Sequence, residues 1–392
     1  MQDNVGIKQQ IRILLVHLVS MGDCLFATTI ARQIKQDYPG CHLTWAISNR
    51  CSQVIQNNPY VDEIWEVFSE TMSDNFGFIW EQTKKEAIAK KEKGFYDYIF
   101  YTQIFPDNFA NYDGTIRSST FRNYPNPITV PVSPVIMLNE KEIENVKIFT
   151  KHHKIDEFRH VILFESSPGS GQSAVNSKFA VELSKKIVDT YNDCIILLTS
   201  NKKIITDHER IIDASAISFR ENAELSKYCT LLIGCSSGIT WLLTSTWAKK
   251  IPTIQILNNK PVLFEFASVS YDLIFWGQST DTIIEITKFE EQHIFNCIKM
   301  TLEDGIEKAR INYNEILKPS YRTLGHVIYI FLIAKQFKNI ITVSGNFFER
   351  NKDHLVILMV PHAISKTLIT SPLVIIRRIK KICMSSGWLS RK

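Results

Sequence analysis

The chain has 392 residues, more than the roughly 250–300 that one hydrophobic core usually supports, so its length predicts two domains. Hydrophobic residues make up 45% of it and charged residues 22%, a balance that excludes a disordered chain. The formal net charge of +5 is only mildly basic. The body of the chain has no dense Lys/Arg stripe with interleaved aromatic residues, so we expect no nucleic-acid partner.

Strands alternate with helices in two series, which is the pattern of parallel, doubly wound α/β sheets. A boundary near residue 150 divides the predicted domains into residues 1–150, 151–318 and 319–392. In the first series, we expect strands at Ile13–Leu18, His42–Ile47, Glu63–Val67 and Tyr96–Tyr101, and helices at Cys24–Asp37, Cys51–Asn57 and Asn75–Lys93. After an irregular stretch at Gln103–Pro134 and a helix at Asn139–Thr150, the second series has strands at Val161–Glu165, Cys194–Thr199, Leu231–Gly234 and Thr253–Leu257, and helices at Ser177–Tyr191, Asn222–Tyr228 and from about Ile239.

The third region is apolar and basic, with possible helices at Gly325–Phe337 and Leu355–Ile382. From His354 to the end it carries seven Lys or Arg residues and no acid. Within it, Ser371–Ile382 has the composition of a basic amphipathic helix, which predicts reversible attachment to an anionic membrane surface. The alternative is a C-terminal helix that packs across the two domains.

The cysteines and the apolar runs indicate in which cellular compartment the protein is expected. Eight cysteines show no CxxC pair and no zinc-ligand spacing, and several lie in apolar runs, as expected of reduced, buried thiols. No run resembles a signal peptide or approaches the roughly 20 apolar residues of a membrane span. We therefore expect a cytoplasmic protein, peripheral on the inner face of the cytoplasmic membrane if its tail binds lipid.

The turn after the first strand contains Ser20, Gly22 and Asp23, and a helix follows it. Gly22 would let the backbone approach a ligand, and free N–H groups at the helix start would favour an anion. Asp23 would lie at the carboxyl end of the first strand, where open α/β sheets bind ligands. The alternative is that Asp23 only caps the helix.

Two further turns, both in the second series, suit the binding of phosphate through backbone amides. One follows Glu165 and is rich in small and hydroxyl residues, and Lys178 comes shortly after it on the next helix. That lysine would add a charge for a diphosphate unless it is a solvated surface residue. The predicted donor-binding residues are Ser167, Gly169, Ser170, Gln172 and Lys178 in the first turn, and Ser236, Ser237, Gly238 and Ile239 in the second.

These motifs resemble glycosyltransferase family 9, the heptosyltransferases of lipopolysaccharide core assembly. The likeness lies in the Ser20–Asp23 turn, the string Asn58–Ile64, and the turn Gly234–Gly238 with the later Ala248–Thr253. It covers about half of the chain. It implies a GT-B fold, in which an acceptor-side Rossmann-like domain faces a donor domain across a cleft, followed here by the C-terminal extension.

The resemblance also implies inverting, metal-independent transfer of a sugar from a nucleotide-diphosphate-sugar to a glycan or glycolipid acceptor. Asp23 would be the general base, Ser20 and Gly22 would lie on the acceptor side, and no cofactor would be needed beyond the nucleotide-sugar co-substrate. His152 and His153 lack a third ligand nearby, so we predict a solvated turn there and no metal site.

The chain departs from the family at Ser236, where the family has Asp, and at Trp241, where it has His. These changes leave the identity of the donor sugar open. Two alternatives to transfer are a GT-B scaffold that binds a nucleotide or glycan without catalysis, and a sugar-nucleotide epimerase. Epimerisation needs further acids near the sugar, and the turns supply only Asp23 and Glu165. The aromatic-rich stretch Gln103–Tyr124 is either an acceptor surface or a packed loop.

Overall fold

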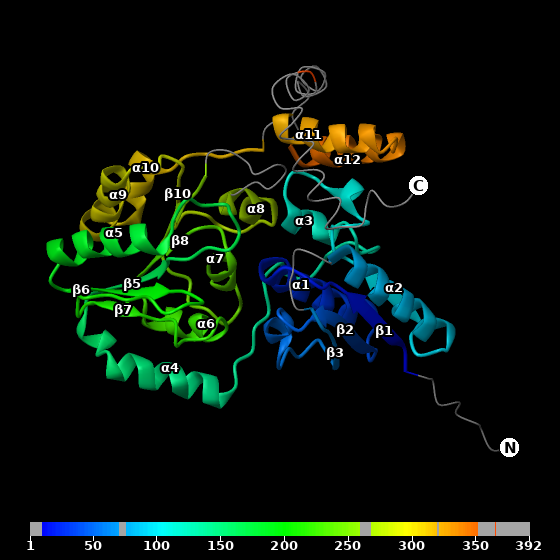
Figure 1. Cartoon of the computed structure of the whole chain (residues 1–392), viewed down its shortest axis with the longest axis horizontal. Helices are drawn as coiled ribbons and strands as arrows, with labels where there is room; N and C mark the ends of the chain where they lie inside the picture. Colours follow the sequence, from blue (N-terminus) through cyan, green and yellow to red (C-terminus); the bar gives the residue numbers. More distant parts are fainter. Residues whose placement is uncertain (1–9, 70–75, 259–267, 320, 352–364, 366–392) are drawn as a thin grey trace.

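The computed structural model describes residues 10–69, 76–258, 268–319, 321–351 and 365. Two parallel sheets, each flanked by helices, lie side by side, and a pair of C-terminal helices lies above the first (Figure 1). The predicted class, two doubly wound α/β domains with a helical extension, is confirmed. Among the described helices, none has both the length and the apolar character needed to span a bilayer.

The first sheet has the strand order β3-β2-β1-β4, and all its pairs are parallel. Its central strand β1 is buried on both faces: Ile13 and Leu15 face the core that contains α1, whereas Leu14 and Val16 face Trp80 of α2. The elements are β1 (Arg12–Val16), α1 (Met21–Asp37), β2 (His42–Ser48), η1 (Ser52–Ile55), β3 (Glu63–Val67), α2 (Phe76–Glu92) and β4 (Tyr98–Tyr101).

The second sheet has the order β10-β9-β8-β5-β6-β7, again with parallel pairs. Strand β5 is central and buried on both faces, like β1. The elements are β5 (His160–Glu165), α5 (Ser177–Thr190), β6 (Cys194–Thr199), β7 (Ile211–Asp213), α6 (Glu221–Leu225), η4 (Ser226–Tyr228), β8 (Leu231–Gly234), α7 (Gly238–Leu242), β9 (Thr253–Ile256), α8 (Val269–Phe275), β10 (Ile283–Ile286), α9 (Glu291–Asp304) and α10 (Ile306–Tyr313).

The segment between the sheets contains η2 (Phe109–Asn111), α3 (Ile116–Phe121), α4 (Glu140–His152) and η3 (Ile155–Glu157). Helix α4 lies beside the second sheet and packs against α6 (Figure 1). An ion pair of 2.7 Å between Glu142 and Arg220 fixes this contact. The chain thus reaches the second sheet before the predicted boundary near residue 150.

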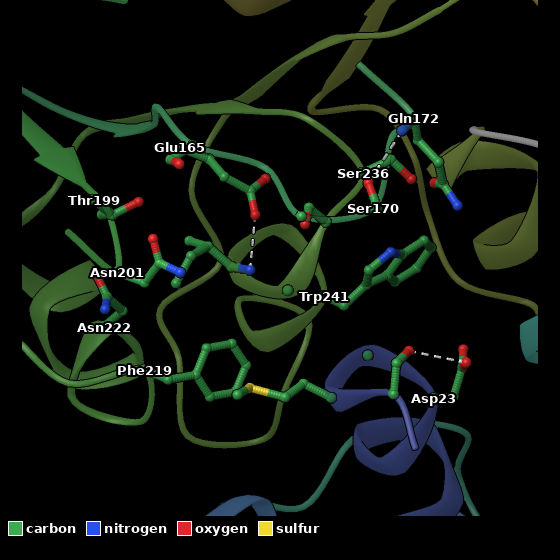
Figure 2. Close-up of a pocket in the computed structure, with 18 of the residues that line it drawn as sticks. Asp23, Glu165, Ser170, Gln172, Thr199, Asn201, Phe219, Asn222, Ser236 and Trp241 are labelled. Atoms are coloured by element: carbon green, nitrogen blue, oxygen red, sulfur yellow. Dashed lines mark hydrogen bonds between the residues drawn. The ribbon is translucent and has the colours of Figure 1, made fainter. Parts of the chain in front are cut away.

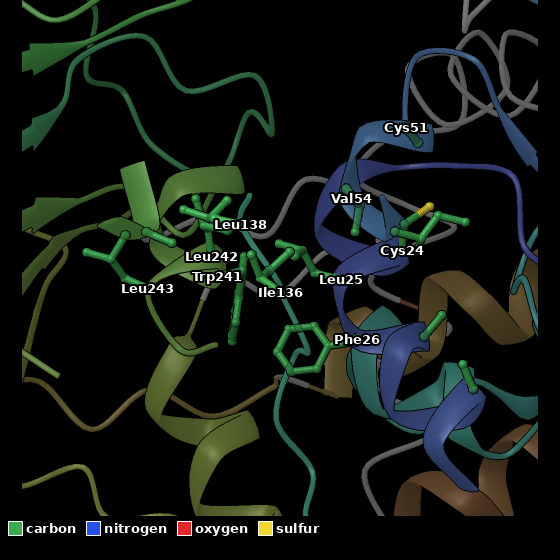
Figure 3. Packing of buried hydrophobic residues seen from close by; sticks show 14 of the residues in the cluster. Cys24, Leu25, Phe26, Cys51, Val54, Ile136, Leu138, Trp241, Leu242 and Leu243 are labelled. Carbon is green, nitrogen blue, oxygen red and sulfur yellow. The ribbon is translucent and has the colours of Figure 1, made fainter. Parts of the chain in front are cut away.

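One hydrophobic core runs through both domains. It contains Leu25 and Phe26 of α1, Ile136 of the connecting segment, and Trp241 and Leu242 of α7. The rings of Phe26 and Trp241 meet edge to face, with centroids 5.1 Å apart (Figure 3). The two domains are therefore held by apolar packing as well as by the chain that joins them.

Helices α11 (Tyr321–Ile333) and α12 (Phe337–Asn351) form a hairpin that returns to the first domain. Phe331 and Phe347 of the hairpin pack in one buried cluster with Ile104, Phe109 and Tyr112. The predicted segment Gly325–Phe337 is thus helical up to Ile333, and a second helix begins at Phe337. Apart from Ser365, the predicted helix Leu355–Ile382 and its amphipathic part Ser371–Ile382 lie outside the described residues.

Candidate active site

A cleft of about 800 Å³ lies where the carboxyl ends of strands from both sheets meet. The first domain contributes the start of α1 and residues of the connecting segment. The second domain contributes the loops after β5, β6, β7 and β8 (Figure 2). Parallel sheets place ligands at this edge, because the helix N-termini and the loops converge there.

Most of the predicted site residues line this one cleft. They are Ser20, Gly22 and Asp23 from the first domain, Ser167, Gly169, Ser170 and Gln172 after β5, and Ser236, Ser237, Gly238 and Ile239 after β8. The exception is Lys178. Its side chain is 85% exposed, lies 3.9 Å from Glu182 on the same helix, and is not among the cleft residues. Its position on the outer face of α5 matches the surface alternative, and this correction removes it from the donor site.

Asp23 lies in the first turn of α1, which begins at Met21 and not at Cys24 as predicted. Ser20 is therefore the N-cap residue, and its hydroxyl donates a hydrogen bond of 3.1 Å to Oδ2 of Asp23. Gly22 is a helical residue with a negative φ, so the tight turn expected there is absent. Ser20 occupies the N-cap position without a side-chain cap hydrogen bond, and Asp23 is the third helical residue, so Asp23 is not the N-cap residue.

The surroundings of Asp23 raise the pKa of its carboxyl group above the ordinary value, chiefly through burial. The charge of Arg117 and the hydrogen bonds from Ser20 act in the opposite direction, and the negative charge of Asp272 adds to the rise. A carboxylate whose pKa is raised is a stronger base than one in water. Asp23 therefore has the electrostatic setting that a general base needs.

Arg117 is a cleft residue that the sequence did not reveal. It lies on α3, and its guanidinium lies 4.0 Å from the ring centroid of Trp241. Its Nε donates a hydrogen bond of 3.0 Å to Asp272, and its side chain is only 7% exposed. Among the described residues that line the cleft, it is the one cation. Of the stretch Gln103–Tyr124, only Phe105, Ile116 and Arg117 line the cleft.

Trp241 lies at the position where the resemblance to glycosyltransferase family 9 predicts a histidine. Its indole packs between Phe26 and the guanidinium of Arg117. A Cβ atom added to Gly22 would lie 3.7 Å from Cδ1 of Trp241, so the indole also touches the start of α1. The indole fills the space between the two domains beside Asp23. The smaller imidazole ring of a histidine would fill this space less completely.

The N-terminus of α7 already holds a carboxylate of the protein. Glu165, at the end of β5, is buried and accepts hydrogen bonds of 2.9 Å from the backbone N–H of Cys235 and of Ile239. It also accepts one of 2.8 Å from the hydroxyl of Thr240. Burial raises the pKa of Glu165, and these donors oppose the rise.

This arrangement corrects the expectation for Ile239. Glu165 is buried and has several hydrogen-bond donors. The backbone N–H of Ile239 is not available to a phosphate, because it donates its hydrogen bond to Glu165. The backbone N–H of Ser236 is likewise used, by Oε1 of Gln255 at 2.8 Å. A phosphate at this turn would have to rely on Ser237 and Gly238.

Four buried polar atoms of the cleft have no hydrogen-bond partner among the described residues. They are Oε1 of Gln172, Oδ1 of Asn222, Oγ of Ser236 and Nε1 of Trp241. Leaving such an atom unpaired costs about 1–3 kcal/mol, so sites of this kind are usually completed by water or a ligand. Both donors and acceptors are represented, as the hydroxyl groups of a sugar or a ribose would require.

Among the residues that the structure describes, no group of three or more His, Cys, Asp or Glu side chains could hold a metal ion. His152 and His153 lie at the end of α4, where His153 packs against Phe149 with ring centroids 4.6 Å apart.

No protein-family model and no curated protein matches the sequence. Among solved structures, a glycosyltransferase of family 9 from Veillonella parvula is similar, with a TM-score of 0.50 and 12% identity over 77% of this chain and 96% of that one. The ADP-heptose LPS heptosyltransferase II of E. coli gives a TM-score of 0.48 and 12% identity over 75% and 99%. A UDP-N-acetylglucosamine 2-epimerase gives 0.43 and 11% over 83% and 97%.

At this identity, the first comparison is evidence for the fold only, and the other two, with lower TM-scores, add no argument about function. The resemblance to glycosyltransferase family 9 suggested by the sequence motifs is thus confirmed at the level of the fold. This chain has the GT-B fold: two Rossmann-like domains that face each other across a cleft.

Proposed function

We propose that this chain is a glycosyltransferase, a divergent relative of family 9, that transfers a sugar from a nucleotide-diphosphate-sugar to a hydroxyl group of a glycan or lipid-linked acceptor. The observation that carries the proposal is the position of Asp23. Its carboxyl group has a raised pKa and lies in an interdomain cleft whose other wall is formed by the loops after β5 and β8.

In the proposed reaction, a carboxylate oxygen of Asp23 accepts the proton of the acceptor hydroxyl. The acceptor oxygen then attacks the anomeric carbon, and the bond from that carbon to the diphosphate oxygen breaks with inversion. Backbone N–H groups of Ser237, Gly238, Gly169 and Ser170 would stabilise the charge that develops on the diphosphate. Arg117 is the cation among the described residues that line the cleft. The proposed chemistry uses no metal ion and no cofactor.

The same proposal gives the protein a place on the cytoplasmic face of a membrane, as expected of an enzyme with a lipid-linked acceptor. It leaves the sugar and the base of the nucleotide open. Ser236 and Trp241 replace the family's Asp and His beside the cleft, so we do not extend the proposal to a heptose donor.

A panel of nucleotide-sugars, incubated with the protein and candidate acceptors, tests the proposal through the release of nucleoside diphosphate. Asp23→Asn should lower turnover by at least about two orders of magnitude, the usual contribution of a general base, while the protein stays folded. Glu140→Gln is the matched control, because it removes an exposed carboxylate from the first turn of α4 without touching the cleft.

Three results would contradict the proposal. Near-normal transfer by Asp23→Asn would show that Asp23 is not the general base and has only a structural role at the start of α1. Binding of nucleotides with no turnover on any acceptor would favour the non-catalytic scaffold, and formation of an epimer without diphosphate transfer would favour the epimerase.

A further inference from the structure

The hairpin of α11 and α12 exposes apolar side chains at its turn. Its inner face is buried against the segment 104–112, but Phe337 is 64% exposed and Ile341, one helical turn later, is 76% exposed. Leu332 and Ile333, at the end of α11, are also exposed. We call Leu332, Ile333, Phe337 and Ile341 the hairpin tip.

The charged residues of the hairpin near its tip have one sign. Lys335 and Lys338 are exposed and lie in the sequence between the residues of the hairpin tip, and the sequence contains no Asp or Glu between Glu315 and Glu349. Exposed apolar side chains with lysines next to them in the sequence are the features by which peripheral proteins bind anionic lipid: the apolar groups enter the acyl boundary while the cations remain among the headgroups.

The same charges disfavour two other occupants. The rest of this chain, from His354 on, carries seven cations and no acid, so it would be repelled by Lys335 and Lys338. It also follows Asn351, at the opposite end of α12 from Phe337, about 20 Å away along a helix of 15 residues. A second copy joined through the same patch would bring lysines against lysines.

The hairpin tip is connected to the cleft by a row of aromatic rings. Phe105 lines the cleft and lies 4.6 Å from Phe109, centroid to centroid, and Phe109 lies 5.6 Å from Phe331 of α11. Leu332 and Ile333 follow Phe331 directly. A surface that holds the tip would therefore lie next to the acceptor side of the cleft.

We infer that the tip of the α11–α12 hairpin is a docking surface for an anionic lipid bilayer, distinct from the basic C-terminal tail. This inference does not depend on sugar transfer, since lipid binding can be measured without any substrate. Should the protein act on a lipid-linked acceptor, the hairpin would hold the cleft beside the surface from which that acceptor projects.

The test is cosedimentation of the full-length protein with vesicles of phosphatidylcholine mixed with phosphatidylserine, compared with vesicles of phosphatidylcholine alone. We expect binding to the anionic vesicles that weakens with added salt. The double variants Phe337→Ser/Ile341→Ser and Lys335→Glu/Lys338→Glu should each reduce the bound fraction at least about tenfold. Because all four side chains are exposed, both variants should fold, which circular dichroism checks.

Matched controls separate the tip from the rest of the surface. Ile311→Ser removes an 85% exposed apolar side chain from α10, and Lys299→Glu reverses an exposed charge on α9, so both should bind as the parent protein does. Arg377→Glu/Arg378→Glu alters only the tail. Vesicle binding that survives both tip variants but is lost with the tail variant would overturn the inference. So would tip variants that change only the oligomeric state in gel filtration, because the tip would then be an interface between copies.

Discussion

Asp272 is the centre of a buried ionic network that joins three parts of the chain. It is fully buried on α8, and it accepts hydrogen bonds from Nε of Arg117 at 3.0 Å, from Nη2 of Arg350 at 2.6 Å and from the hydroxyl of Thr115 at 2.6 Å. Arg350, on α12, also pairs with the buried Asp113 at 3.0 Å. The network therefore ties the second domain and the C-terminal hairpin to the connecting segment.

We predict that Asp272→Asn destabilises the protein strongly. The amide has the shape of the carboxylate, so no cavity forms, but Arg117 and Arg350 lose a buried negative charge. Arg350 keeps only Asp113, which it shares with Arg122. Arg117 loses its ion pair with Asp272 and keeps, among the described residues, only the longer-range attraction of Asp23. Removing one partner of a buried ion pair costs about 3–5 kcal/mol, so we expect the free energy of unfolding to fall by at least about 3 kcal/mol.

Urea denaturation followed by circular dichroism measures this change. Asp281→Asn is the control, since Asp281 is exposed and its hydrogen bonds are local ones with Ser279; it should change the free energy of unfolding by less than about 0.5 kcal/mol. A loss below about 1 kcal/mol for Asp272→Asn would refute the reasoning, because the arginines would then be neutralised without Asp272.

Four further predictions concern the cleft and Lys178, which lies outside it. Transfer activity should be lost as the pH is lowered, because Asp23 becomes protonated and can no longer act as a base. Since the pKa of Asp23 is raised, a pH–rate profile should show this loss at a pH above the ordinary range of an aspartate. The pKa of Asp23 is higher in the folded than in the unfolded protein, so protonated Asp23 adds to the free energy of unfolding. This contribution is fully present below the pKa of Asp23 in the unfolded chain and is lost as pH rises through its pKa in the folded protein. Asp23→Asn should therefore unfold at higher urea than the parent at neutral pH, and a lower midpoint would contradict the sign. Gly238→Val should weaken nucleotide binding in calorimetry by displacing Phe219, whose Cε2 lies 3.0 Å from the new Cβ; unchanged affinity would move the donor site. Lys178→Ala should leave nucleotide affinity unchanged, and a clear loss would restore the lysine to the site.

The parallel sheets were predictable because their central strands are apolar on both faces. Strands β3, β6 and β8 have the predicted bounds. Strands β6 and β8 end where apolar residues give way to small or polar ones, whereas Phe68 directly follows β3. The three-residue β7 and the elements after β9 up to α10 were missed. A strand as short as Ile211–Asp213 has no measurable hydrophobic period. It forms because it pairs with the edge of the neighbouring strand β6.

The site was predictable where a turn follows a strand, and not elsewhere. Asp23 and the loop residues are placed by the topology of the sheet, which a sequence reveals. Arg117 is brought to Asp23 by the folding of an irregular segment, and no local pattern signals it. The role of Glu165 depends on β5 and α7 being neighbours, which the order of the elements alone does not give. Lys178 was placed in the donor site wrongly. Neighbouring positions on a helix face different directions, and the sequence alone did not show that the side chain of Lys178 faces water and not the cleft.

The packing of Trp241 against Phe26 limits how the two halves of this chain can be separated or exchanged. A fragment that ended near residue 150 would leave Leu25, Phe26 and Ile136 without the indole and its neighbours, and such an apolar face favours aggregation. A donor domain transplanted from a relative with histidine at this position would meet α1 with a smaller ring and leave a void beside Asp23. New substrates would then be reached more readily by editing the cleft loops than by recombining whole domains.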